Sequence, residues 1–296
     1  MIADGRAWPE PRVLATGLGF PEGPVYLGHG AVAFTEIRGA CITRYANGGT
    51  TLVATTGGGA NGATLGADGE IWVANNGGIS LGPGGYWFSP DPIDGRIQRV
   101  TSHGGCLDAS GDLPGEAPHR PNDICFGPDG NLYFTDPRNW EDLANLKPGR
   151  IWRMDPSTGH AKVVADVPLF CNGLAFGPDP VKVYVAQSMA MKIVELDWSP
   201  AGLGPAHEWA ALPQGFPDGF CFAANGDCYV CGSTADVLQV FDAEGALKRT
   251  LEFQEHSEPT NCCLGDGVLY VTCSGSGELL ALDIGVEPLP LYPFRN

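Results

Sequence analysis

The sequence predicts an all-β protein, a six-bladed β-propeller whose four-stranded antiparallel blades surround a central channel. One pattern recurs six times along the 296 residues: a polar head, a short apolar strand, a tight turn and a second apolar strand. The 43 Gly and 25 Pro residues are spread over the whole chain, which favours many short strands joined by turns. No segment shows sustained helical periodicity.

The third copy, residues 120–137, shows the repeat most plainly. It opens on the polar pair Asn122-Asp123, and its two apolar strands are separated by the turn Asp129-Gly130. Asp-Gly and Asn-Gly pairs tolerate the positive φ angles of tight hairpin turns. The other five copies cover residues 21–36, 61–74, 172–186, 218–230 and 260–272.

The spacing of the copies predicts a closed ring rather than two domains. Successive heads lie 39 to 61 residues apart, close to the length of a four-stranded propeller blade. The remaining strands of each blade are expected in alternating segments between the copies, such as 96–100 and 150–154. We therefore expect one domain over residues 1–296, with another sheet stack, such as a sandwich, as the alternative. Part of 79–120 is longer than a blade loop requires, so we expect an insertion that covers one face as a lid.

Composition limits the partners of the protein. A net charge of −17 and a pI near 4.5 argue against nucleic acid, because phosphate binding needs a basic surface. The polar start of the chain and the lack of a long apolar run predict no signal peptide and no membrane span, hence a cytoplasmic protein. Cys228 and Cys231 have the spacing of a metal or redox pair, but residues three apart on a strand face opposite sides. We expect the cysteines to be reduced.

The heads of the six copies carry the candidate chemistry. The innermost strand of each propeller blade lines the channel, so equivalent residues on successive blades form a ring. Carboxylates and amides without Lys or Arg at the same level suit hard cations such as Ca²⁺, Mg²⁺ or Mn²⁺. The alternative is that Asn and Asp recur because they form turns, but their equivalent positions in the repeats favour a metal site. The heads are Glu22, Asn61, Asn122, Asn172, Asp218 and either Thr260 or Asn261.

Six short motifs, in order along the chain, resemble the SMP-30/gluconolactonase/luciferin-regenerating-enzyme family over roughly residues 12–284. The resemblance implies a six-bladed propeller and one divalent cation, Ca²⁺ foremost, with Zn²⁺, Mn²⁺ and Mg²⁺ as alternatives. The motifs are Pro-Glu-Gly-Pro (21–24), Arg-Pro-Asn-Asp (120–123), Tyr-Phe-Thr-Asp-Pro (133–137), Cys-Asn-Gly-Leu (171–174), Pro-Asp-Gly (217–219) and Pro-Thr-Asn-Cys-Cys (259–263).

The resemblance also assigns roles to single residues. Glu22, Asn172 and Asp218 match the positions that hold the cation, and Asn122 matches a further metal ligand or substrate contact. Asp218 matches the proposed general base, and Arg120 matches an arginine that orients sugar-lactone substrates. Two features depart from the family: Gln187-Ser188 stands where many members have an acidic residue and threonine, and 79–120 matches no family motif.

We therefore expect metal-dependent hydrolysis of a lactone, with a sugar-acid lactone as the substrate. The cation would polarise the lactone carbonyl, and Asp218 would activate the attacking water. Two alternatives stay open: hydrolysis of phosphotriesters in the manner of calcium-dependent propellers, and a non-enzymatic metal- or ligand-binding role. A serine or cysteine nucleophile has little support, because no Gly-x-Ser-x-Gly motif occurs. His119, His207 and His256 are expected in loops or at the surface.

Overall fold

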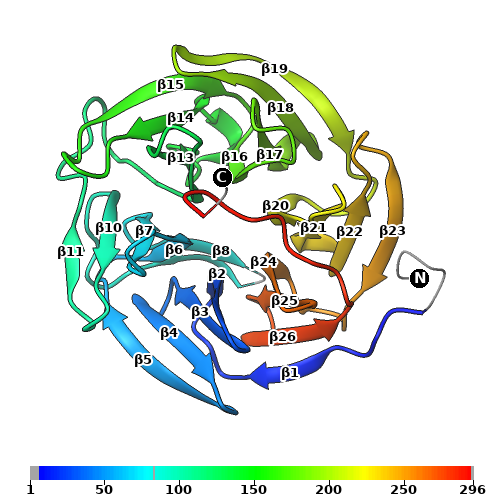
Figure 1. Ribbon diagram of the computed structural model, residues 1–296. Coiled ribbons are helices and arrows are strands. Elements are labelled where there is room, and N and C mark those ends of the chain that lie inside the picture. The colour runs from blue at the N-terminus through cyan, green and yellow to red at the C-terminus, as the bar shows by residue number, and fades with distance from the viewer. Residues whose placement is uncertain (1–6, 83, 295–296) are drawn as a thin grey trace.

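A computed structural model describes residues 7–82 and 84–294 and shows six four-stranded antiparallel sheets arranged as a ring (Figure 1), which confirms the predicted six-bladed propeller. From the channel outward, the first three blades are β2 (Pro21–Gly28), β3 (Ala31–Glu36), β4 (Cys41–Ala46) and β5 (Gly49–Thr55); β6 (Ala60–Leu65), β7 (Ile71–Asn75), β10 (Arg96–Val100) and β11 (Cys106–Asp108); and β12 (Ile124–Phe126), β13 (Leu132–Asp136), β14 (Gly149–Met154) and β15 (Ala161–Val167). The last three are β16 (Cys171–Phe176), β17 (Lys182–Gln187), β18 (Lys192–Ser199) and β19 (Gly202–Ala211); β20 (Pro217–Phe222), β21 (Cys228–Gly232), β22 (Val237–Phe241) and β23 (Leu247–Glu252); and β24 (Pro259–Gly265), β25 (Val268–Cys273), β26 (Glu278–Asp283) and β1 (Arg12–Ala15).

The ring closes at the sixth blade, which combines both ends of the described chain. Strand β1 pairs antiparallel with β26, with Arg12 opposite Ala281 and Val13 opposite Leu280. The innermost strands contact one another in order around the channel, and β24 contacts β2 to complete the circle. Closure of this kind leaves no blade without two neighbours.

The innermost strands are irregular at the repeat heads. In β6, β16 and β20 the pairing with the next strand shifts register, so that two residues oppose one. Such a bulge bends the strand and changes the direction of the side chains on it. The bulged pairs are Asn61-Gly62, Asn172-Gly173 and Asp218-Gly219. Each bulge therefore combines a polar head, whose side chain enters the channel, with a glycine.

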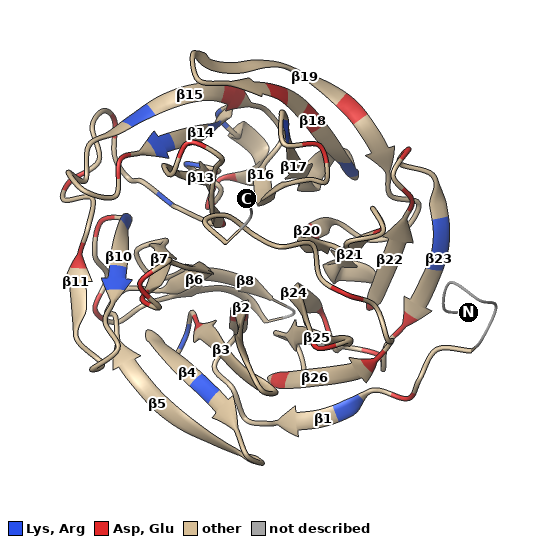
Figure 2. Cartoon of the chain, in the orientation of Figure 1, with Lys and Arg blue, Asp and Glu red and all other residues tan. Residues whose placement is uncertain are grey.

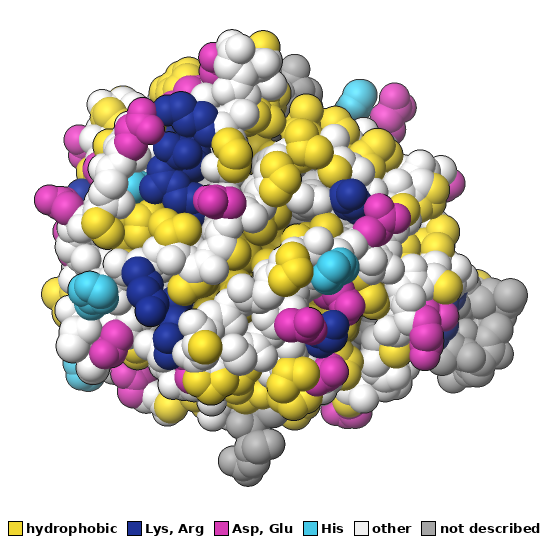
Figure 3. All heavy atoms as spheres, turned by 90° about the horizontal axis from the view of Figure 1, so that it is seen from above, with side chains coloured by type: hydrophobic (Ala, Val, Ile, Leu, Met, Phe, Trp, Pro, Cys, Tyr) yellow, Lys and Arg dark blue, Asp and Glu magenta, His cyan; other side chains and the backbone are white. Residues whose placement is uncertain are grey.

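Apolar side chains pack between neighbouring blades, while charged residues lie mainly on outer strands and loops (Figure 2). Cys231 belongs to the core between the fifth and sixth blades and Cys228 to the core between the fourth and fifth, so the two thiols face opposite sides of β21 as expected. All ten cysteines are free thiols. On the face shown in Figure 3, basic side chains occur in short groups next to acidic and apolar ones.

The stretch 79–120 supplies both a hairpin and blade strands. Strands β8 (Ile79–Gly82) and β9 (Gly85–Phe88) form a separate two-stranded sheet, and β10 and β11 complete the second blade. In the described part of the chain, short 3₁₀ helices lie in the loops that follow the second strands of three blades: η1 (Leu143–Asn145), η2 (Ser188–Ala190) and η3 (Ser233–Ala235). Within 7–82 and 84–294, no helix has the length and apolar character needed to cross a membrane.

The two ends of the channel differ. After β26 the chain crosses the centre of the ring (Figure 1), where the Leu289 N–H donates to the Phe222 carbonyl at 3.1 Å. Residues 288–291 thereby line a cavity at the end where the innermost strands finish. The opposite end, where these strands begin, holds the polar heads.

Candidate functional site

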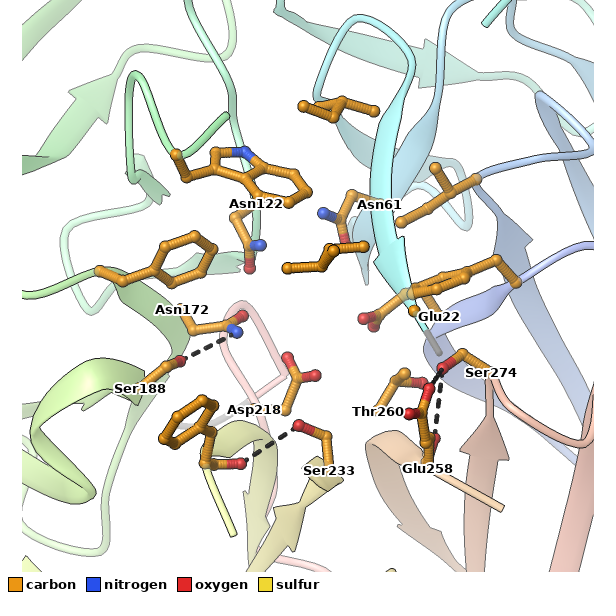
Figure 4. Close-up of a pocket in the computed structure, with 18 of the residues that line it drawn as sticks. Glu22, Asn61, Asn122, Asn172, Ser188, Asp218, Ser233, Glu258, Thr260 and Ser274 are labelled. Carbon is orange, nitrogen blue, oxygen red and sulfur yellow. Dashed lines mark hydrogen bonds between the residues drawn. The ribbon is translucent and has the colours of Figure 1, made fainter. Parts of the chain in front are cut away.

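All six blades contribute a head to one cavity of about 270 Å³ at the start of the innermost strands (Figure 4). Thr260 lines this cavity, whereas Asn261 lines the cavity at the other end of the channel, so Thr260 is the head of the sixth copy. The other five heads are Glu22, Asn61, Asn122, Asn172 and Asp218. The structure thus brings together four of the five predicted site residues, and Arg120 is the one that does not line the cavity.

Two carboxylates face each other's charge in the cavity: Glu22, which is buried, and Asp218, which is half-buried at the surface of the cavity. Burial raises the pKa of Glu22 well above its usual value, and the nearby charge of Asp218 raises it further. Burial also raises the pKa of Asp218, to about 8, although a hydrogen bond from Asn172 partly offsets this effect. Both groups are therefore costly to ionise by themselves, and a bound cation would remove that cost.

The donor set fits a hard divalent cation. It consists of two carboxylates and several amides, the oxygen ligands that Ca²⁺ and Mg²⁺ prefer. Within the described residues no group of three or more His, Cys, Asp or Glu side chains is arranged to hold a metal. The fit therefore depends on the amide oxygens of Asn122 and Asn172 as well as on Glu22 and Asp218.

Ser188, at the position where the sequence departs from the family pattern, orients Asn172. The Asn172 Nδ2 donates to Ser188 Oγ at 3.2 Å (Figure 4). Ser188 Oγ in turn donates to the Pro217 carbonyl at 2.7 Å. Because the amide nitrogen is occupied in this way, the Asn172 Oδ1 stays available for a cation or substrate. The second bond ties the fourth blade to the residue preceding Asp218.

Threonine hydroxyls on one blade bond backbone carbonyls at, or next to, the head of the neighbouring blade. Thr135 Oγ1 donates to the Asn172 carbonyl at 2.8 Å, and Thr260 Oγ1 donates to the Pro21 carbonyl at 2.8 Å. Thr35 Oγ1 bonds the Asn61 carbonyl in the same manner. Our interpretation of the sequence missed this role, although a Ser or Thr recurs at the end of the second strand of several copies. That repetition was the available signal.

Arg120 lies behind the cavity rather than in it. Its Nη1 donates to the Asn76 and His119 carbonyls, each at 3.3 Å, and its Nη2 is 3.6 Å from Glu141 Oε1. Asn76 and Trp140, the residue before Glu141, both line the cavity. The guanidinium therefore supports two cavity loops and makes no direct contribution to the lining.

His119 sits in a loop, as expected, but is buried beside Asp136, with 3.5 Å between Nδ1 and Oδ2. Burial opposes ionisation of Asp136, but the bond with His119 and the backbone N–H groups of Arg120 and Arg138 outweigh it and lower the pKa of Asp136. This cluster anchors the loop before Asn122. His207 and His256 are exposed and do not line the cavity.

These features define a six-bladed propeller with a buried oxygen-donor site at one end of its central channel. Residues 20–275 match the family described as the SMP-30/Gluconolactonase/LRE-like region, and the chain belongs to this family. A gluconolactonase from Zymomonas mobilis is 24% identical over 237 residues, which are 73% of this chain and 61% of that protein. The chain spans about three-fifths of the length of the first curated relatives it matches.

Solved structures share the fold. A gluconolactonase from Xanthomonas campestris superposes with a TM-score of 0.76 at 23% identity, covering 95% of this chain and 90% of that one. A protein described as the calcium-binding protein regucalcin, from Agrobacterium tumefaciens, gives a TM-score of 0.75 at 18% identity and covers 97% and 98%. At these low sequence identities, the likeness shows that the chains share the propeller fold and shows nothing further.

Proposed function

We propose that the protein is a divalent-cation-dependent lactonase. The observation that carries the proposal is the carboxylate pair Glu22 and Asp218, which share one cavity with the amides of Asn122 and Asn172 and have raised pKa values. Membership of a family that includes gluconolactonases supports the reaction class, and the description of the Agrobacterium relative as calcium-binding supports Ca²⁺ as the first candidate. Zn²⁺, Mn²⁺ and Mg²⁺ are the alternatives.

Glu22, Asn172 and Asp218 would hold the cation, with Asn122 as a further ligand or as a contact to the substrate. A bound divalent cation supplies Lewis-acid polarisation of a carbonyl group. Asp218 in its ionised form, which a neighbouring cation favours, accepts a proton from water as that water attacks the lactone carbonyl. The proton then passes to the ring oxygen as the C–O bond breaks, and the product is a hydroxy acid.

Among lactones, the sugar-acid class implied by the resemblance requires hydrogen-bond partners for several hydroxyl groups. Arg120 was expected to supply one of these partners, but its guanidinium is bound to Asn76, His119 and Glu141 outside the cavity. We therefore propose lactone hydrolysis as the reaction. The side chains that line the cavity decide which substituents on the lactone ring it accepts.

The direct test is a hydrolysis assay that follows acid release with a pH indicator. The protein is treated with a chelator, assayed on a panel of lactones and one phosphotriester, and assayed again after addition of each divalent cation. We expect lactone turnover that disappears with the chelator and returns with Ca²⁺. Turnover of the phosphotriester alone would reassign the site to that reaction, and cation binding without any turnover would indicate a binding protein.

A further inference from the structure

A second level of residues lies directly above the polar heads. In each copy we consider the residue two positions before the head. The backbone carbonyl at this position accepts an N–H from the segment after the second strand, for example Ser188 N to Phe170 O and Ser233 N to Phe216 O, each at 3.0 Å. The same bond at Phe20, Gly59 and Glu258 shows that these positions are structurally equivalent. The six residues are Phe20, Gly59, Arg120, Phe170, Phe216 and Glu258.

Three of these six positions are phenylalanine, and all three phenylalanines line the cavity. Phe20 and Phe170 have φ angles of 60° and 64°, in the left-handed region that bulky side chains rarely adopt. The surroundings hold both side chains in place: Arg38 lies 4.9 Å above the Phe20 ring, and Trp140 packs edge-on to Phe170 with the ring centroids 5.6 Å apart. Strained aromatic residues that face a cavity point to a role in that cavity.

Other apolar side chains close the gaps that Gly59 and Arg120 leave in this level. The β8–β9 hairpin places Ile79 and Leu81 against the cavity, and the loop after β13 places Trp140 there. The level above the heads is therefore mainly hydrocarbon. We call it the apolar wall, and its members are Phe20, Ile79, Leu81, Trp140, Phe170 and Phe216.

Polar groups near the apolar wall are already bonded within the protein. Asn76 Oδ1 accepts the N–H groups of Gly78 and Ile79 at 2.9 and 3.1 Å, and its Nδ2 donates to the Ile79 carbonyl at 2.9 Å. Thr234 Oγ1 accepts the Phe216 N–H at 3.1 Å. Glu258 Oε2 accepts from Ser274 Oγ at 3.5 Å, and the Glu258 carboxylate keeps further acceptor capacity on one side of the rim. A ring with several hydroxyl groups would lose bonds to water here without gaining equivalent ones.

We propose that the site takes a lactone with an apolar substituent, an alkyl chain or an aromatic ring, in preference to a polyhydroxylated lactone. This inference rests on the proposed lactonase function and replaces the sugar-acid substrate implied by the sequence resemblance. The lactone group lies among the polar heads and the substituent lies against the apolar wall. A cavity of about 270 Å³ suits a monocyclic lactone with a short chain or a bicyclic aromatic lactone.

The first test compares substrates with the full-length, Ca²⁺-loaded protein. The substrates are δ-valerolactone, δ-lactones with alkyl chains of increasing length, dihydrocoumarin and glucono-δ-lactone, each corrected for spontaneous hydrolysis. Burial of one methylene group corresponds to a factor of about four in kcat/KM, so kcat/KM should rise by about that factor per carbon until the cavity is full. Higher kcat/KM for glucono-δ-lactone than for the alkyl lactones would overturn the proposal.

Variants locate the effect on the apolar wall. Phe216→Ala should lower kcat/KM for the alkyl lactones about tenfold, chiefly through KM, and should lower it less for δ-valerolactone, which has no substituent to bury. Phe216→Leu keeps an apolar side chain and should retain most of the preference. Leu81→Ala shortens a side chain of the apolar wall and should also lower kcat/KM for the alkyl lactones. Its matched control is Leu52→Ala on the outer strand β5, where Leu52 is 63% exposed and outside the cavity. An equal loss in both leucine variants would contradict the proposal.

A binding measurement separates this inference from the proposed reaction. Lactams are not hydrolysed on the time scale of the assay, so calorimetry can compare 3,4-dihydroquinolin-2-one with gluconolactam. We expect the aromatic lactam to bind about tenfold more tightly or better, and Phe216→Ala to reduce that difference. Selective lactam binding without turnover of any lactone would overturn the lactonase proposal alone. Turnover together with tighter binding of gluconolactam would overturn the substrate inference alone.

Discussion

Asp218 combines two proposed roles at the scale of a single residue, as a cation ligand and as the acceptor of a proton from water. Asp218→Asn preserves the shape of the side chain and one ligating oxygen but removes the negative charge and the proton acceptor. We expect kcat/KM for lactones to fall by about 10²–10⁴, the range for loss of a general base. The measurement is the pH-indicator assay at saturating Ca²⁺.

A matched control for this change is Asp91→Asn. Asp91 is an exposed aspartate that does not line the cavity, so its replacement should leave kcat/KM unchanged. Turnover of Asp218→Asn close to that of the control would refute the assigned role of Asp218.

Ser188 acts through Asn172, whose Nδ2 donates to its hydroxyl at 3.2 Å. Ser188→Ala removes the hydroxyl that holds the Asn172 amide in its orientation, and loss of such a supporting contact typically weakens metal binding about 10- to 100-fold. We expect this loss in a calorimetric titration with Ca²⁺. Ser188→Thr restores the hydroxyl and should restore affinity. Equal affinity in the alanine and threonine variants would show that Ser188 does not orient the ligand.

The carboxylates also make the stability of the cation-free protein depend on pH. The pKa of Asp218 is about 8 in the folded protein, compared with 3.8 for an unperturbed aspartate. Between these values the folded state holds a proton that the unfolded chain has released, so stability falls as pH rises. In a chelator, the melting temperature of the wild type should fall from pH 5 to pH 8 more steeply than that of Asp218→Asn.

Addition of Ca²⁺ should reverse this decline in the wild type, because the cation favours the ionised carboxylates. Parallel melting curves for the wild type and Asp218→Asn across this pH range would contradict the raised pKa of Asp218.

At the residue scale, sequence patterns predicted the polar heads because the repeat gave each of them an equivalent position. The resemblance identified Arg120 as a substrate contact, but its guanidinium is bound to the Asn76 carbonyl and Glu141 on other loops. A side chain with long reach depends on tertiary partners that the repeat does not specify. The repeat pattern does not predict Phe170 and Phe216 for a different reason, since both residues precede the segments that repeat.

At the scale of the elements, the glycines within the bulges allow neighbouring innermost strands to approach closely. A Cβ on Gly173 would lie 2.4 Å from the Asp218 carbonyl oxygen, and one on Gly219 would lie 2.0 Å from Asn261 Cγ. Contacts this short require a shift of the strand that carries Asp218 or of the side chain that faces Gly219. The head-glycine pairs in the sequence therefore reflect packing around the channel as well as turn preference.

Gly173→Ala tests this packing. We expect the free energy of unfolding to fall by about 1–3 kcal/mol, as for other overpacked sites, and Ca²⁺ affinity to fall because the Asp218 backbone is displaced. Denaturant unfolding and calorimetry measure the two effects. Gly49→Ala is the control, since a Cβ there meets nothing within 4 Å. A Gly173→Ala variant as stable as this control would show that the strands can separate without cost.

The strand pattern was predictable because each copy contains its own turn and its own short apolar strands. The second strands of the blades follow the predicted segments closely. The β8–β9 hairpin is harder to predict from sequence, because its two strands pair with each other and belong to no blade and to no copy of the repeat. Residues 79–120 contain both this hairpin and the strands β10 and β11. Length alone indicated an insertion, but only tertiary structure shows that Ile79 and Leu81 face the cavity. Whether the hairpin acts as a lid stays a proposal.

At the scale of the whole molecule, the ring depends on a single closure between distant parts of the chain. The sixth blade contains β24, β25 and β26 from late in the chain and β1 from its beginning. Repeat counting predicted six blades, but it could not assign β1 to the last of them, because the repeats do not specify which strand completes it. Trp8 reinforces the closure: its Nε1 donates to the Thr250 carbonyl at 3.3 Å, and Arg249 lies 4.2 Å above its ring.

Removal of this closure should affect the site at a distance. A chain that begins at Thr16 lacks β1 and leaves the edge of β26 unpaired, which weakens the sixth blade and exposes an edge for association between molecules. The sixth blade carries Thr260, which bonds the Pro21 carbonyl next to Glu22. We expect a lower melting temperature, concentration-dependent aggregation and weaker Ca²⁺ binding. A chain that begins at Trp8 keeps β1 and serves as the control. If both chains melt alike and bind Ca²⁺ equally, the pairing of β1 with β26 does not hold the ring together.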